Sequence, residues 1–100
     1  GCRLSVNQIH LTANIVAQDA LRFTPAGVPA VDLRLSHESS QEEAGAIRHV
    51  RLVLRAVAFG LLAERLSRVS LQQAWRFTGF LASSPSGRSA VLHIQEFQPV

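Results

Sequence analysis

The segment VRLVLRAVAFGLLAERLSR, from Val50 to Arg68, contains the change of hydrophobic period that decides the predicted fold. Up to Ala56 every second side chain is apolar, which is the period of a half-buried strand. After Ala58 the apolar side chains are spaced by three or four residues, at Phe59, Leu62, Ala63 and Leu66. This is the spacing of a helix that packs one face on a sheet. We therefore predict a strand followed by one short amphipathic helix over Val57 to Arg68.

Two further strands are predicted before this segment. Apolar and polar residues alternate from Asn7 to Val16 and again from Val31 to Glu38. Between them, the segment Phe23 to Pro29 has two prolines around Gly27, which is typical of a turn in which the glycine adopts a positive φ. The polar segment Ser39 to Gly45 has no such alternation, and we predict that it is a loop.

The C-terminal third predicts two more strands. Trp75, Phe77 and Leu81 return to the period of a strand, and Trp75 is expected to pack in the core. A Ser, Pro and Gly-rich turn follows at residues 83–87, and a last strand runs from Ala90 to Phe97. The order is then three strands, one helix and two strands. It predicts an all-β, five-stranded OB-fold barrel with one short helix between strands 3 and 4, a fold whose strand 2–3 face binds oligonucleotides.

Length and composition set the class of protein. With 100 residues, the chain is expected to be a single OB-fold domain over residues 1–100, with Gly1 left out of the fold prediction. The one cysteine, Cys2, cannot form an internal disulfide or a Cys-rich zinc site. No segment approaches the roughly 18 apolar residues that span a membrane. We expect a cytoplasmic protein without a metal or a cofactor.

The basic residues favour a nucleic-acid partner. All ten are Arg, and with seven acidic residues they leave a net charge of +3. Arg binds phosphate through two parallel hydrogen bonds and stacks on bases, so an all-Arg set indicates nucleic acid, although only mildly at this net charge.

Several segments carry a resemblance to a known family: Thr24 to Pro29, His37 to Gly45 with Arg48 after it, Gly79-Phe80 and Val91 to His93. They resemble the primosomal replication protein N family, or PriB family, of bacterial replication restart. The segment HESSQEEAG, from His37 to Gly45, is the most specific. The resemblance covers the chain from Asn7 onward, and it implies an OB-fold homodimer that binds single-stranded DNA. It also implies a bridge between a restart helicase and helicase-loading proteins. The better-known members have an aromatic residue where Arg51 stands and a basic residue where Glu38 stands.

Candidate DNA-binding residues come from the predicted outer face and from the loops. The predicted phosphate contacts are Arg34, Arg51, Arg55 and His49 on strands 2 and 3, Arg48 and Arg22 beside loops, and Arg88 in the last hairpin. A solvated strand face is the alternative interpretation of the same arginines. On the first strand His10, Thr12 and Asn14 are polar but uncharged, and we expect them at a two-fold dimer interface.

The remaining polar residues do not indicate an enzyme. His37 is expected to be a hydrogen-bonded core or interface histidine, and Glu42 and Glu43 to be solvated carboxylates. The four histidines are scattered and have no zinc-ligand spacing. We therefore predict a single-stranded DNA-binding accessory protein of the restart primosome. The alternatives are a protein-interaction scaffold with weak DNA affinity, and an ordinary single-stranded DNA-binding protein that lacks its acidic tail.

Overall fold

The computed structural model describes residues 5–100, so Gly1 and Cys2, to which two of the predictions refer, lie outside the described residues. The strands are β1 (Ile9–Gln18), β2 (Arg22–Phe23), β3 (Pro29–Glu43), β4 (Ala46–Phe59), β5 (Ala74–Ser83) and β6 (Ala90–Pro99). One helix, α1 (Leu61–Leu66), lies between β4 and β5.

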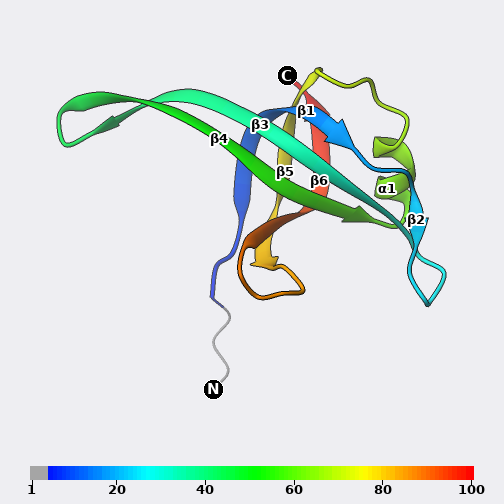
Figure 1. The fold of residues 1–100 in the computed structure, drawn as a ribbon. Coiled ribbons are helices and arrows are strands. Elements are labelled where there is room, and N and C mark those ends of the chain that lie inside the picture. The colour runs from blue at the N-terminus through cyan, green and yellow to red at the C-terminus, as the bar shows by residue number, and fades with distance from the viewer. Residues whose placement is uncertain (1–4) are drawn as a thin grey trace.

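The sheet closes on itself as a barrel (Figure 1). Its strand order is β1-β5-β6-β4-β3, and β1 pairs with β3 to complete the ring, while the short β2 pairs only with β3. The pairing of β4 with β6 is parallel and consists of Ala56 with Leu92 and Val57 with His93; the other pairings are antiparallel. The predicted five-stranded OB-fold barrel is therefore confirmed. Within residues 5–100, no helix is long and apolar enough to cross a membrane.

The barrel interior is filled by the apolar side chains of alternate strand residues. The largest fully buried side chains are Phe77, Ile15, Leu35, Leu66, Leu92 and Val31. Trp75 packs against this core, as predicted, with its ring edge-to-face with Phe97 at 5.0 Å between centroids. Its buried Nε1 has no hydrogen-bond partner among the described residues.

The helix is shorter than predicted. Val57 and Phe59 belong to β4, and the helix begins at Leu61 rather than at Val57. Gly60 separates the two elements with a φ of 74°, a conformation that glycine adopts without strain. The prediction was wrong because the apolar residues at the end of β4 continue the apolar spacing of α1. Phe59 is 42% exposed and does not close the barrel, whereas Leu66 does.

The predicted loop from Ser39 to Gly45 is also wrong, because β3 continues to Glu43 and β4 begins at Ala46. Only Ala44 and Gly45 form the turn, with φ values of 52° and 79°. Two successive positive φ values are typical of a two-residue hairpin turn. Beyond the barrel, residues 37–43 of β3 pair only with residues 46–52 of β4, among the residues described. We call this two-stranded hairpin, residues 37–52, the arm (Figure 1). Its polar sequence resembles a loop because both of its faces meet solvent.

Two leucines of α1 give a matched test of how the helix covers the barrel. Leu66 is fully buried and Leu61 is 72% exposed. Leu66→Ala is expected to lower the free energy of unfolding by about 2–5 kcal/mol, because it leaves a cavity in the core. Leu61→Ala should change it by less than about 0.5 kcal/mol. Urea denaturation measures both, and equal effects would contradict the orientation of α1.

Candidate nucleic-acid interface

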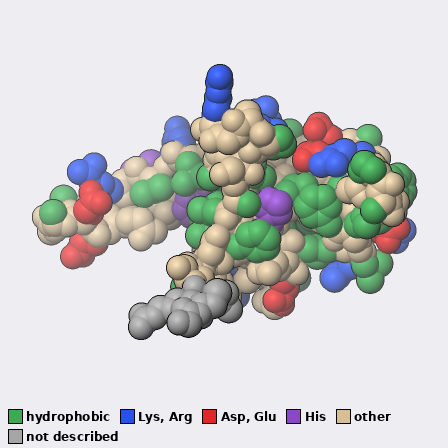
Figure 2. Space-filling view, turned by 90° about the horizontal axis from the view of Figure 1, so that it is seen from below, with side chains coloured by type: hydrophobic (Ala, Val, Ile, Leu, Met, Phe, Trp, Pro, Cys, Tyr) green, Lys and Arg blue, Asp and Glu red, His purple; other side chains and the backbone are tan. Residues whose placement is uncertain are grey.

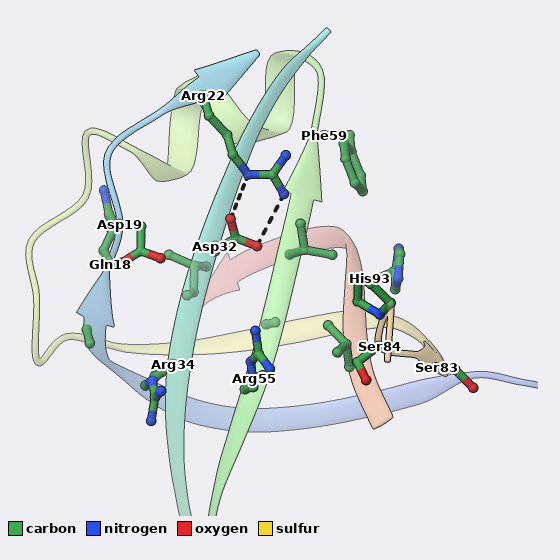
Figure 3. Close-up of a pocket in the computed structure, with 16 residues that line it drawn as sticks. Gln18, Asp19, Arg22, Asp32, Arg34, Arg55, Phe59, Ser83, Ser84 and His93 are labelled. Atoms are coloured by element: carbon green, nitrogen blue, oxygen red, sulfur yellow. Dashed lines mark hydrogen bonds and ion pairs between the residues drawn. The ribbon is translucent and has the colours of Figure 1, made fainter. Parts of the chain in front are cut away.

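A groove with a volume of about 570 Å³ lies on the outer face of the barrel, where β3 and β4 meet the β5–β6 hairpin (Figure 3). Alternate residues of β3 and β4 face it, because successive side chains of a strand point to opposite sides. The charged side chains that line the groove are Asp19, Arg22, Asp32, Arg34 and Arg55. Three of these side chains are basic and two are acidic, so they leave a net charge of +1.

Arg34 and Arg55 are the two groove arginines that have no carboxylate partner among residues 5–100. They stand directly opposite each other in the register of β3 and β4, and both are exposed. Neither forms an ion pair with another residue of the described part of the chain. Like charges directly opposite each other destabilise a strand pair. An anion bound between the two guanidinium groups would remove this repulsion, so the pair is a candidate phosphate site.

Arg22 also lines the groove, but a carboxylate already binds it. Its Nε donates to Oδ2 of Asp32 at 2.8 Å, and Nη2 donates to Oδ1 at 3.4 Å (Figure 3). The hydrogen bond from Asp32 and its negative charge raise the pKa of Arg22. Because Asp32 neutralises this guanidinium, Arg22 is a weaker candidate for phosphate than Arg34 or Arg55.

Three rings form a stack beside the arginines, and the sequence analysis did not identify it. The ring of His93 lies 4.9 Å from that of Phe80, with 15° between their planes, and 6.0 Å from that of Phe59, with 30°. Phe59 and His93 line the groove (Figure 3). The stack was missed because Phe59 was assigned to the helix. It also depends on the register that places His93 opposite Phe80 on β5 and beside Val57 on β4.

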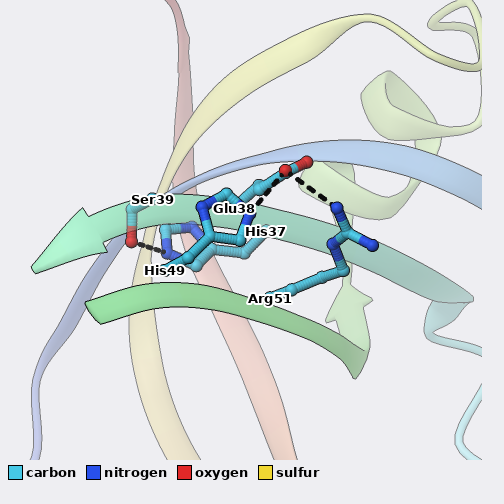
Figure 4. Close-up of polar contacts among 5 residues, drawn as sticks. All are labelled: His37, Glu38, Ser39, His49 and Arg51. Carbon is cyan, nitrogen blue, oxygen red and sulfur yellow. Dashed lines mark hydrogen bonds and ion pairs between the residues drawn. The ribbon is translucent and has the colours of Figure 1, made fainter. Parts of the chain in front are cut away.

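The other cations of the predicted strand face lie on the arm and are paired with carboxylates. Oε1 of Glu38 accepts hydrogen bonds from Nε2 of His49 at 2.8 Å and from Nη2 of Arg51 at 3.2 Å (Figure 4). The hydrogen bonds from Arg51 and then His49 lower the pKa of Glu38. Nearer the tip, Arg48 pairs with Glu43, and Figure 2 shows basic and acidic side chains side by side there.

Two more residues from the sequence analysis lie outside the groove. Arg88 is exposed in the turn between β5 and β6 and lines a smaller hollow that shares Ser83 with the groove. His37 is half-buried, with Nδ1 at 2.8 Å from the carbonyl oxygen of Thr12 and Nε2 at 2.8 Å from Oγ of Ser39. Both ring nitrogens have partners, as expected for a structural histidine.

The three residues predicted for a dimer interface are on β1. His10 and Thr12 are exposed and Asn14 is half-buried. Between Ile9 and Ala13, β1 pairs with β5 on one edge, while its other edge has no strand neighbour among the described residues. The polar side chains therefore lie next to an edge without a strand neighbour in the described part of the chain, where the ring of His37 meets the carbonyl oxygen of Thr12.

Gly79 fixes the position of the ring stack. A Cβ atom at this position would overlap the carbonyl oxygen of His93 and lie 2.9 Å from its carbonyl carbon. The register of β5 and β6 shifts at this point, between Thr78 and Gly79. Only glycine allows the two strands to approach so closely, and this approach sets Phe80 against His93.

Gly79→Ala is therefore expected to lower the free energy of unfolding by about 3 kcal/mol, because the added Cβ forces the backbones of β5 and β6 apart. The control is Gly87→Ala, where the added Cβ meets nothing but the φ is +73°. Backbone strain alone should cost about 1–2 kcal/mol there. Thermal and urea denaturation compare the two variants, and a smaller loss for Gly79→Ala would contradict the close approach.

The barrel and its groove define the class: this is an OB-fold protein, a class in which the same strand face serves as the binding surface.

The chain matches the family described as "another single-strand binding protein family" over residues 7–96. It is 42% identical over 94 residues to the replication restart protein PriB of Bordetella pertussis, covering 91% of this chain and 86% of the relative. It is 32% identical over 91 residues to PriB of Nitrosomonas europaea, covering 90% and 84%.

Solved structures give the same result. PriB from Ralstonia solanacearum has a TM-score of 0.87 and 32% identity, covering 95% of this chain and 98% of that one. The SSB domain of a Synechococcus protein, at 18% identity and a TM-score of 0.72, shares the fold. The chain belongs to the single-strand binding protein family and, within it, to the PriB replication restart proteins.

Proposed function

We propose that this chain binds single-stranded DNA in the groove between β3, β4 and the β5–β6 hairpin. The observation that carries the proposal is the pair Arg34 and Arg55, which lie opposite each other, form no ion pair within residues 5–100 and stand beside the ring stack. The arginines contact phosphates, which is the main source of affinity for nucleic acid of any sequence. Arg88 contributes a further positive charge from the neighbouring turn.

The ring stack offers the DNA strand a second kind of contact, with its bases. Phe59 is 42% exposed and stacks on the ring of His93, which in turn stacks on Phe80. A base stacked on such a ring contributes about 1–3 kcal/mol and is accepted whatever its identity. The binding mode is therefore one in which guanidinium groups contact the backbone and Phe59 contacts a base. Catalysis forms no part of it.

The cellular role follows from the family. PriB relatives carry the name of replication restart proteins, and we propose the same role for this chain, in the cytoplasm, next to a restart helicase and helicase-loading proteins. The arm supports a protein-interaction function as a second candidate. On its outer face Ile47 is 72% exposed, and Val53, just beyond the arm, is 64% exposed, while the cations between them are compensated by carboxylates.

Binding to oligo-dT, measured by fluorescence anisotropy at several salt concentrations, tests the DNA proposal. Arg34→Ala and Arg55→Ala are each expected to weaken binding and to reduce the slope of log K against log salt by about 0.7 for each phosphate no longer bound. Phe59→Ala should weaken binding about 5- to 100-fold and leave the slope unchanged, since it removes stacking only. Arg68→Ala removes an exposed charge outside the groove and serves as the control.

Wild-type affinity in both Arg34→Ala and Arg55→Ala would contradict the groove as the DNA site. If wild-type protein also failed to bind oligo-dT at low salt, the scaffold function would be the better one.

We also propose that the chain forms a homodimer through β1. Within residues 5–100, β1 has no strand neighbour on this edge between Ile9 and Ala13. A second copy can add its own β1 there by displacing the His37 ring from the Thr12 carbonyl oxygen, and the uncharged His10, Thr12 and Asn14 permit the close approach. In a two-fold dimer both subunits contribute the same surface to the interface. A substitution that adds one charge to each chain therefore adds two charges to the interface.

Thr12→Arg is expected to convert the dimer to monomers at tens of micromolar protein, because two arginines would repel each other across the axis. Gln95→Arg, an exposed position on β6, adds the same charge elsewhere and should leave the dimer intact. Sedimentation velocity measures the state of both variants. A wild-type protein that sediments as a monomer at this concentration would disprove the interface.

A further inference from the structure

The row of outward-facing side chains that begins at the groove continues onto the arm. Because β3 and β4 are in antiparallel register, Arg34 lies opposite Arg55, and further along the same face Glu38 lies opposite Arg51. His49 follows Arg51 on this face of β4. Between Arg34 and His49 on this face, Glu38 is the acidic residue among basic ones.

The contacts of Glu38 resemble those of a phosphate oxygen. A single carboxylate atom, Oε1, accepts hydrogen bonds from both Nη2 of Arg51 and Nε2 of His49 (Figure 4). Guanidinium groups bind carboxylate and phosphate through the same donors and in similar geometry. A DNA phosphate that approaches Arg51 therefore competes with Glu38 for the positive charge and for Nη2 of Arg51, and the negative charge of Glu38 repels it.

These ion pairs do not explain the stability of the arm. The side chains are 55% exposed for Glu38, 73% for Arg51 and 58% for His49. Ion pairs as exposed as these contribute little to folding. A glutamate carboxylate is charged at neutral pH, and Arg51 and His49 lower the pKa of Glu38 further through their hydrogen bonds. The triad is thus a charged, weakly held contact that another anion can replace.

We propose that Glu38 is an internal competitor of the DNA phosphates for Arg51 and His49, and that it confines the bound strand to the groove. This inference rests on the proposed DNA-binding function. With Glu38 in place, the arm adds no net positive charge at this point, and the strand is held by Arg34, Arg55 and the ring stack. When Glu38 is neutralised, Arg51 and His49 become free to continue the phosphate track along the arm.

The test compares Glu38→Gln with Glu42→Gln. Both variants remove one negative charge from the same face of β3, and Glu42 forms no ion pair within residues 5–100. Oligo-dT of about 4 and about 16 nucleotides, the range covered by one OB-fold, serves as the probe in anisotropy titrations. Glu38→Gln is expected to raise the affinity for the longer oligonucleotide about 5- to 10-fold, and to steepen the salt slope by about 0.7 for each additional phosphate that the arm binds.

The same variant should change the affinity for the shorter oligonucleotide less than 2-fold, because that strand stays in the groove. Glu42→Gln should change both affinities less than 2-fold. In an Arg51→Ala background, Glu38→Gln should lose most of its effect, since the competed cation is gone. Circular dichroism of each variant verifies that the fold is retained.

Equal effects of Glu38→Gln and Glu42→Gln would overturn the inference, because they would reflect net charge alone. An effect of Glu38→Gln that persists fully with Arg51→Ala would overturn it as well. If wild type binds oligo-dT and Glu38→Gln binds equally well, the competitor role fails while the DNA-binding function stands. If neither protein binds, both fail.

Discussion

The short parallel pairing between β4 and β6 is the contact on which the rest of the structure depends. In the described part of the chain two residue pairs, Ala56 with Leu92 and Val57 with His93, join these strands, and together with the β1–β3 pairing they complete the barrel. The same pairing brings His93 beside the end of β4, so that its ring lies between Phe59 and Phe80. The same pairing therefore positions both the core and the groove, because the inward-facing residues of these strands fill the barrel and the outward-facing residues line the groove.

The sequence predicted the parts of the fold that depend on local periodicity. Alternating residues identified the strands around Ile15, Leu35 and Phe77, and these side chains fill the core. The outer part of the arm, from Ser39 to Gly45, was predicted as a loop, because a hairpin with solvent on both sides has no apolar face to produce the alternation. The start of α1 was misplaced because Val57 and Phe59 fit the spacing of a helix as well as that of a strand, and only the positive φ of Gly60 separates the two.

The candidate site was harder to predict than the fold, because arginines with similar sequence surroundings have neighbours of opposite charge in the structure. Arg34 and Arg51 are both exposed on strands of the same hairpin. Arg34 lies opposite another arginine and Arg51 opposite a carboxylate, and this difference follows from the register alone. The register in turn depends on the turn at Ala44 and Gly45, whose position the polar composition of the segment concealed. Inter-strand neighbours are long-range information that periodicity does not carry.

The two-stranded construction of the arm has a consequence for its dynamics. A pair of strands without a third strand or a core face is marginally stable by itself. We therefore expect the arm to open and re-form without unfolding the barrel, and its amide hydrogens to exchange with solvent faster than those of β4 near Ala56, which has strand neighbours on both sides. The hairpin that carries Glu38 and Arg51 is thus expected to open locally, at a lower free energy than global unfolding of the barrel.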